Sequence, residues 1–222
     1  RVVFSGNLVV SPSLTAVRLD GPCQDVSILG GELIDTDETV SNAGIVIVSP
    51  SGNPVADLIV EGVRIKGFNT GVSTTGATNS TRGKIARCYI VTRSRAFTIQ
   101  QFVDLDILDN IIYGDVGVYL YMAHRVHYKG NKHRNQNAVS NIVDVQTTQN
   151  PIIEGNQFMV LGTIRFFNTT DAYLDQRLSV SGLTLVGTNT FLPGSRYYTG
   201  GNDKLGLVYT GSSWADLVAY PS

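Results

Sequence analysis

The chain has 222 residues, 42% of them apolar, which suffices for one large or two small globular domains with a sizeable core. Charged residues make up only 16% and the formal net charge is -1, so composition gives no electrostatic case for binding nucleic acid or an anionic membrane. No run approaches the roughly eighteen apolar residues of a membrane span, so membrane insertion is not expected. The polar residues are rich in Ser, Thr, Asn and Gly, which suits neutral polar partners such as sugars.

The chain begins RVVFSGNLVVSPS, which has neither the form of a signal peptide nor an initiating Met. We therefore expect a fragment or a processed product. The stretch from 7 to 22 predicts the opening coil of a solenoid, with Val9, Leu14, Val17 and Leu19 as core residues.

A short element recurs seven times along the chain. In each copy an alternating strand leads into a tight turn and a second short strand, as in DLDILDNIIY at 104–113. The copies begin at residues 25, 57, 82, 104, 125, 150 and 177, so they recur at intervals of 21 to 32 residues. A repeat of this length is typical of stacked coils.

A third short strand follows most copies, and its apolar residues recur with period two, as in strands with one buried face. The alternation predicts two inward columns that fill the coils. These columns are Ile45, Val72, Phe97, Val118, Val143 and Ile164, and beside them Ile47, Thr74, Ile99, Leu120, Val145 and Phe166.

The turn after the first strand of each copy is rich in Gly and Asn, which tolerate left-handed backbone angles. Asn110, Asn131 and Asn156 fall at the same position in three successive copies. We therefore expect their side-chain amides to stack and to form hydrogen bonds along the turn.

The pattern ILDNII at 107–112 with GVYL at 117–120, repeated as IEGNQF at 153–158 with TIRF at 163–166, resembles the parallel β-helix of pectate-lyase-like proteins and phage tailspikes. The resemblance covers residues 1 to about 186. It implies an all-β fold: a single-stranded, right-handed parallel β-helix of about seven to eight coils, with each strand paired in parallel to the coils above and below.

Residues 187–222 follow the last copy and are expected to form a C-terminal cap. A strand-like LGLVY, a GSS turn and WADLVAY predict a small hairpin, which would cover the pairing edges and the core at the open end of the solenoid. The segment YTGSSWADL is similar to hairpins at the ends of phage tail proteins, which implies a role in contacts within a trimer.

Outward positions of the third strands collect aromatic, amide and charged side chains in adjacent coils. Neighbouring strands lie about 4.8 Å apart, so these side chains are expected to form one surface. Its residues are Gln100, Tyr119, Tyr121, Asp144, Gln146, Arg165 and Phe167. Aromatic rings that lie against sugar rings, with polar groups for the hydroxyls, are what a polysaccharide-binding groove needs.

The sequence leaves two interpretations of this surface open. In one, a sugar chain binds laterally, with Tyr119, Tyr121 and Phe167 as platforms. In the other, the aromatic side chains are buried against a neighbouring subunit of a trimer, and Asp144 and Arg165 form a simple ion pair.

The spacing of the copies predicts insertions at 35–43, 49–56, 76–82 and 168–176. We expect the last of them to bring Asp171, Tyr173 and Asp175 close to the aromatic surface. A glycosidase needs two carboxyl groups about 5 Å apart for retention or about 6.5 to 9.5 Å apart for inversion. Asp144 with Asp171 or Asp175 is the candidate catalytic pair, and Tyr173 is a further candidate for binding the sugar.

The sequence predicts neither a metal site nor a cofactor. His124, His127 and His133 fall within one coil but lack cysteine or acidic partners at metal-ligand spacing, and His133 takes an inward position. Cys23 and Cys88 lie two coils apart, which is too far for a disulfide, and both are expected to be buried thiols.

The resemblance implies a phage tailspike or tail-fibre module: a homotrimer on the virion tail, outside the cell, that binds bacterial O-antigen or capsule and, if it is an enzyme, cleaves it as an endoglycosidase. Two alternatives stay open, a secreted microbial polysaccharide hydrolase or lyase that acts as a monomer, and a purely structural fibre segment. The calcium-lyase signature is missing, and an isolated RIK at 64–66 is the sole match to the polygalacturonase motifs, which disfavours pectin degradation.

Overall fold

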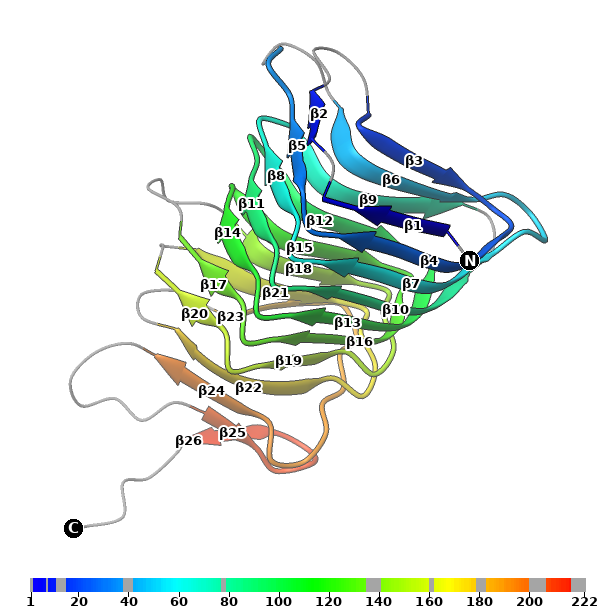
Figure 1. The fold of residues 1–222 in the computed structure, drawn as a ribbon. Helices are drawn as coiled ribbons and strands as arrows, with labels where there is room; N and C mark the ends of the chain where they lie inside the picture. The colour runs from blue at the N-terminus through cyan, green and yellow to red at the C-terminus, as the bar shows by residue number, and fades with distance from the viewer. Residues whose placement is uncertain are drawn as a thin grey trace.

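The computed structural model describes residues 2–6, 8–10, 15–37, 42–76, 79–134, 141–159, 162–178, 183–199 and 207–216. Within these ranges the chain forms strands and turns and contains no helix. The strands wind into one solenoid, from the blue N-terminal coils to the orange and red C-terminal strands (Figure 1). The expected core residue Leu14 lies outside the described residues.

Each full coil contributes one strand to each of three rows, two of which form the first sheet. The long row consists of β1 Val2–Ser5, β4 Cys23–Leu29, β7 Val55–Glu61, β10 Ser80–Ala86, β13 Phe102–Leu108, β16 His124–Lys129, β19 Ile152–Glu154, β22 Tyr173–Leu178 and β24 Arg196–Thr199. The short row consists of β2 Leu8–Val10, β5 Glu32–Ile34, β8 Arg64–Lys66, β11 Tyr89–Val91, β14 Ile111–Tyr113, β17 Lys132–His133 and β20 Gln157–Phe158.

The third row is the second sheet. Its strands are β3 Val17–Asp20, β6 Ala43–Ser49, β9 Thr70–Gly76, β12 Arg95–Gln100, β15 Val116–Tyr121, β18 Asn141–Gln146, β21 Thr163–Phe167 and β23 Leu183–Val186. Figure 1 shows the second sheet behind the long row, with the short row along one side.

Strands of one row pair in parallel from coil to coil. Ile85 of β10 pairs with Ile107 of β13, and Ile107 pairs with Tyr128 of β16. In the second sheet, Phe97 of β12 pairs in the same way with Val118 of β15. The predicted parallel β-helix is therefore confirmed, and the first six aligned copies correspond to successive coils.

The interior of the coils is filled by apolar side chains. Each residue of the two predicted inward columns of the second sheet, from Ile45 to Phe166, is at most 1% exposed. They pack against inward residues of the long row such as Val60 and Ile107, and of the short row such as Ile90, in one continuous core. Because the core leaves no pore, a ligand must bind on an outward face.

The corner between the long and the short row has a left-handed backbone in coil after coil. Gly62, Arg87, Asp109 and Gly130 all have φ between 53° and 67° there. At Gly130 a Cβ would lie 2.2 Å from Asp109 Oδ1, so the close approach of the neighbouring coil adds a second reason for glycine.

The predicted asparagine stack is confirmed and lies directly after this corner. Asn110, Asn131 and Asn156 are at most 4% exposed. The Asn131 side-chain oxygen accepts the backbone N–H of Asn110 at 3.0 Å, and its Nδ2 donates to Ile107 O at 2.9 Å. Asn156 Oδ1 accepts the backbone N–H of Asn131 at 2.9 Å. We call this stack the asparagine ladder.

Different residues occupy the two ends of the asparagine ladder. At one end the backbone N–H of Cys88 donates to Asn110 Oδ1 at 2.9 Å. At the other, Gln176 Oε1 accepts the backbone N–H of Asn156 at 3.1 Å, and Gln176 Nε2 donates to Asn156 O at 2.5 Å. The ladder therefore links five successive coils.

The seventh predicted copy, at 177–186, is in the wrong register. The strand of that coil is β22, which starts at Tyr173, and residues 183–186 form β23 of the second sheet rather than a short-row strand. β22 pairs with both β19 and β20, and none of its residues has a positive φ. With Gln176 in place of a Gly-Asn turn, the chain continues across the position of the corner.

The C-terminal strands include the predicted hairpin. β24 still pairs in parallel with β22, beyond residue 186. β25, Leu207–Tyr209, and β26, Trp214–Asp216, then add in antiparallel order. Phe191 packs edge-on against the core ring of Phe166, with ring centroids 5.0 Å apart, and Tyr209 packs on Phe191. These aromatic side chains cover part of the core at this end.

Both cysteines are free thiols, and one of them is buried as expected. Burial raises the pKa of the Cys88 thiol to about 11, so Cys88 is unreactive at neutral pH. Cys23 is only half-buried, and its thiol donates to Asp20 O at 3.0 Å.

Replacing Asn131 by alanine tests the asparagine ladder. The Asn110 N–H and the Ile107 carbonyl would lose their partners inside the protein, and each unsatisfied group costs about 1–3 kcal/mol. We expect Asn131→Ala to lower the free energy of unfolding by about 2–5 kcal/mol, measured by urea denaturation. The exposed Gln157→Ala serves as the control. Equal midpoints for the two variants would show that the ladder does not stabilise the fold.

His133 is buried as predicted, and its Nε2 donates to Gly114 O at 2.6 Å. Burial lowers the pKa of His133 below its ordinary value near 6.5, so the unfolded chain binds more protons once the pH falls below about 6.5. The stability contributed by neutral His133 is therefore present above that pH and lost as the pH falls toward the folded-state pKa. In His133→Gln, which keeps a donor, we expect a smaller loss of unfolding free energy between pH 7 and pH 5. An unchanged slope would contradict this assignment.

Candidate functional site

The second sheet brings together the seven side chains predicted to form one outward surface. Tyr119, Asp144 and Arg165 pair in register on β15, β18 and β21. A second column, two residues further along each strand, contains Gln100, Tyr121, Gln146 and Phe167. These seven residues are called the Tyr119 surface.

The polar side chains of the Tyr119 surface are joined to one another. Gln146 Nε2 donates to both oxygens of Asp144, at 3.2 and 3.1 Å. Arg165 Nη1 lies 3.6 Å from Asp144 Oδ2, and the Tyr119 hydroxyl lies 3.5 Å from Gln146 Oε1. Asp144 is 9% exposed. The predicted Asp144–Arg165 ion pair is therefore present, within a network that fixes the carboxylate.

The two tyrosine rings are parallel, with an interplanar angle of 4° and centroids 6.4 Å apart. The Arg95 guanidinium lies 4.7 Å from the centroid of the Tyr119 ring, and Arg165 lies 5.9 Å from that of Phe167. The Tyr121 ring has no such cation over it among the described residues, and Tyr121 is 37% exposed. Tyr121 is therefore the most accessible platform of this surface.

Arg95 belongs to this surface but was not among the predicted residues. It lies on β12, two positions before Phe97, and pairs with Val116 of β15. Period-two alternation upstream from Thr98 and Gln100 leads to Ala96, which is buried, and places Arg95 in register with the inward Phe97 and Ile99, so the alternation alone would not have found it.

The Tyr119 hydroxyl is affected by its surroundings. Partial burial, and then the nearby Asp144 carboxylate, raise the pKa of Tyr119 above its ordinary value of 10.0. Both causes disfavour the phenolate, so Tyr119 remains a neutral hydrogen-bonding group at physiological pH.

Asp171, Tyr173 and Asp175 do not extend from the second sheet as a loop, contrary to our expectation. Tyr173 and Asp175 lie on β22 in the long row, where they pair with Ile152 and Glu154. Asp171 lies before β22 with φ 51°, and its backbone N–H donates to Thr190 Oγ1 at 2.8 Å. The wrong register of the seventh predicted copy explains this difference, because the start of β22 was predicted to be part of an insertion. Asp144 and Asp175 therefore lie on different sheets.

The outward face of the long row carries charges of opposite sign on adjacent coils. His127 Nε2 lies 3.0 Å from Glu154 Oε1, and Lys129 Nζ lies 2.9 Å from the same oxygen. The bonds from Lys129 and His127 lower the pKa of Glu154. These contacts join adjacent coils in register, which supports a structural role.

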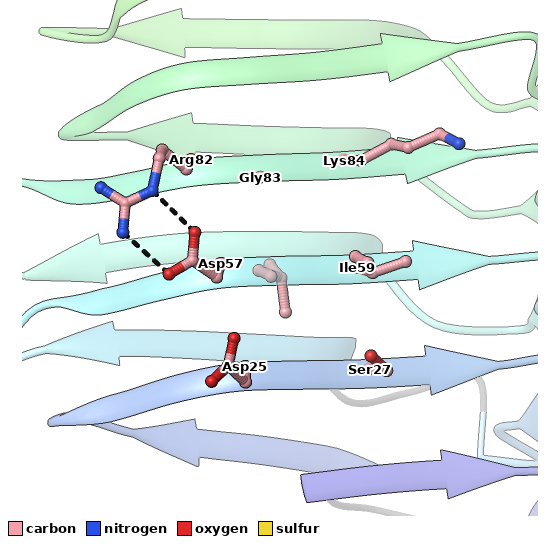
Figure 2. A pocket seen from close by; sticks show the side chains of 8 residues that line it. Asp25, Ser27, Asp57, Ile59, Arg82, Gly83 and Lys84 are labelled. Atoms are coloured by element: carbon pink, nitrogen blue, oxygen red, sulfur yellow. Dashed lines mark hydrogen bonds and ion pairs between the residues drawn. The ribbon is translucent and has the colours of Figure 1, made fainter. Parts of the chain in front are cut away.

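A hollow of about 550 Å³ lies further along the same face (Figure 2). Arg82 binds both oxygens of Asp57, at 2.7 and 2.8 Å, and Asp25 lies on the neighbouring strand. Ile59 and Lys84 line the other end of the hollow. Lys84 Nζ lies 3.7 Å from a Glu61 oxygen. Because charged groups here pair within the stack of coils, the candidate site is placed on the second sheet.

Two features are absent from the described ranges. These ranges contain no group of three or more His, Cys, Asp or Glu side chains that could hold a metal ion. They also contain no helix with the length and hydrophobicity required to cross a membrane.

Comparison with known proteins adds no evidence about the fold or the family. No protein-family model, no curated protein and no solved structure matches the chain. The resemblance to pectate-lyase-like proteins therefore rests on the parallel β-helix itself, and any finer assignment must come from the outward faces.

Removing the Asp144 charge tests the electrostatics of the Tyr119 surface. The carboxylate disfavours the Tyr119 phenolate, so Asp144→Asn is expected to lower the pKa of Tyr119 toward 10.0 in an ultraviolet absorbance titration. Asp106→Asn removes a carboxylate from the long row and is expected to leave the Tyr119 titration unchanged. A Tyr119 pKa that does not move in Asp144→Asn would show that the two groups are not coupled.

Proposed function

We propose that the protein is an extracellular carbohydrate-binding module and that the Tyr119 surface binds a polysaccharide laterally. The observation that carries the proposal is the half-exposed Tyr121 ring beside a fixed set of amide, carboxylate, guanidinium and phenol groups. A ring of this kind lies against the apolar face of a sugar, and the neighbouring polar groups bond its hydroxyls.

The charges of this surface favour a neutral sugar chain. Asp144 and Arg165 compensate one another at 3.6 Å, and the Arg95 guanidinium lies over the Tyr119 ring at 4.7 Å. Gln100 offers an uncharged donor and acceptor beside Tyr121. The contacts that hold Asp144 and Gln146 in place are made within the protein. A ligand would therefore meet a preorganised surface, which reduces the entropy cost of binding.

Binding is better supported than hydrolysis. The Tyr119 surface includes one carboxylate, Asp144, and both of its oxygens accept hydrogen bonds from Gln146. The two other candidate carboxylates lie outside it, Asp175 on the long row and Asp171 before β22. A glycosidase of the usual kind requires a second carboxyl group across the scissile bond, so the proposal is limited to binding.

The proposed setting is the tail of a bacteriophage, where the module would act as part of a homotrimeric tailspike or tail fibre that recognises bacterial surface polysaccharide. This rests on the resemblance of the repeat to tailspike β-helices and of YTGSSWADL to hairpins of phage tail proteins. If the protein is not part of a virion, the alternative is a secreted, monomeric polysaccharide hydrolase or lyase.

One observation favours a subunit interface instead. Tyr121 and the adjacent Met122 are 37% and 39% exposed, and Asp144 has its partners within the chain. Apolar side chains of this size are suited to burial against a second subunit. Sedimentation of the wild type and of Tyr121→Arg decides the matter, since dissociation of a trimer by Tyr121→Arg would identify the surface as the interface.

The binding proposal is tested with an array of neutral O-antigen and capsular polysaccharides. We expect at least one to bind, and we expect Tyr121→Ala to weaken that binding about tenfold, as for the loss of one aromatic contact. Tyr173→Ala, on the long row, removes the same side chain from a face outside the Tyr119 surface and serves as the matched control. The proposal fails if no neutral polysaccharide binds or if the two variants bind equally well.

A further inference from the structure

The short row presents a second outward face with a different chemistry. Its middle residues, such as Ile65 and Ile90, point inward and are buried, so the residues on either side of them face outward. The outward residues from β8 to β17 and the position after it are Arg64, Lys66, Tyr89, Val91, Ile111, Tyr113, Lys132 and Arg134. These eight residues are called the short-row face.

This face is basic although the whole chain has a net charge of -1. It carries four cations and no carboxylate. Glu32, on β5 beside it, binds Arg64 at 3.0 Å. Lys66, Lys132 and Arg134 form no ion pair with a carboxylate among the described residues. The other ion pairs described above join the strands of the long row or of the second sheet, so unpaired positive charge is concentrated here.

Two tyrosines occupy the centre of this face. The rings of Tyr89 and Tyr113 lie 5.6 Å apart at an angle of 48°, and the Arg64 guanidinium lies 5.6 Å from the centroid of Tyr89. Tyr89 is 36% exposed. The backbone N–H of Arg134 donates to Ile112 O at 2.7 Å, which places Arg134 next to Tyr113 on the adjoining coil.

The order along the solenoid axis is therefore cations, aromatic rings, cations. Arg64 and Lys66 lie on β8, the tyrosines on β11 and β14, and Lys132 and Arg134 on and after β17. Coils repeat at about 4.8 Å, so about 14 Å separates the two groups of cations. The two coils between them carry no charge on this face.

This spacing selects among anionic polymers. Nucleic acid carries one negative charge per nucleotide on each strand, and a polyuronate carries one on every sugar, so both would also bring negative charge to the two coils that carry no cation. A polysaccharide that alternates acidic with neutral sugars places one neutral ring over the Tyr89–Tyr113 pair, whose ring centroids lie 5.6 Å apart, and a carboxylate toward the cations on each side. A flat anionic membrane presents negative charge evenly, so it would not match the separation of the cations by the two tyrosines.

We propose that the short-row face is a second binding site, for an acidic polysaccharide in which charged and neutral sugars alternate. The two tyrosines together stack on one neutral sugar, and Lys66, Lys132 and Arg134 bind the carboxylates of the sugars on either side. The site is independent of the Tyr119 surface, because it lies on another row of strands and uses none of the same residues.

Hyaluronan oligosaccharides, in which glucuronate alternates with a neutral sugar, are the probe. We expect binding that weakens as salt rises and that falls about tenfold in Lys66→Gln/Arg134→Gln and again in Tyr89→Ala. Lys84→Gln/Arg18→Gln removes the same net charge elsewhere and is expected to change binding by less than twofold. Tyr121→Ala is expected to leave hyaluronan binding intact, so the failure of one site is distinguishable from the failure of the other.

The binding of four other ligands is measured for comparison with hyaluronan: polygalacturonate, dextran, single-stranded DNA and phosphatidylserine vesicles. Weaker binding of all four supports the proposal. Equal or tighter binding of any of them, lost in Lys66→Gln/Arg134→Gln, would assign the face to that ligand and overturn the alternating-sugar proposal. Absence of hyaluronan binding at low salt, or equal loss in the control variant, would overturn it as well.

Discussion

The asparagine ladder is the interaction on which the rest of the structure depends. At the corner between the long and the short row the chain must turn while its backbone is buried, and each buried N–H or carbonyl without a partner costs about 1–3 kcal/mol. Asn131 supplies both kinds of partner, since Oδ1 accepts the Asn110 N–H and Nδ2 donates to Ile107 O. Both partners lie on the preceding coil, so the ladder stabilises the corner and joins adjacent coils at once.

The register of the strands at this corner determines which side chains lie on the outward faces. A slip of one residue in a strand exchanges its inward and outward side chains, and the core here is fully packed. With the register held, Tyr119, Asp144 and Arg165 align across three strands, and Tyr89 and Tyr113 meet across two. The binding properties of each face therefore depend on a buried feature that no ligand touches.

The sequence predicted much of this fold because each coil obeys the same local rules. Alternation of apolar residues located the inward columns, and the recurrence of Asn110, Asn131 and Asn156 at one position of the repeat located the corner. Where the local signal ended, the prediction failed. In the last coil Gln176 replaces the Gly-Asn pair and still bonds Asn156 through its longer side chain, so the strand begins at Tyr173, before the predicted copy. Tyr173 and Asp175 were misplaced for this reason.

Many charged residues of this chain lie at long-row positions that have left-handed backbone angles. Asp57, Arg82, Asp104 and Arg125 occupy one position in successive coils with φ between 50° and 60°, a conformation unfavourable for residues other than glycine. Arg82 binds both oxygens of Asp57, and Arg125 does the same to Asp104. Exposed pairs of this kind contribute little to stability because solvent screens them, so they offset only part of that cost. Many charged residues serve in such pairs, whereas Lys66, Lys132 and Arg134 have no carboxylate partner within the described ranges. Their concentration beside two tyrosines therefore requires an explanation outside the fold.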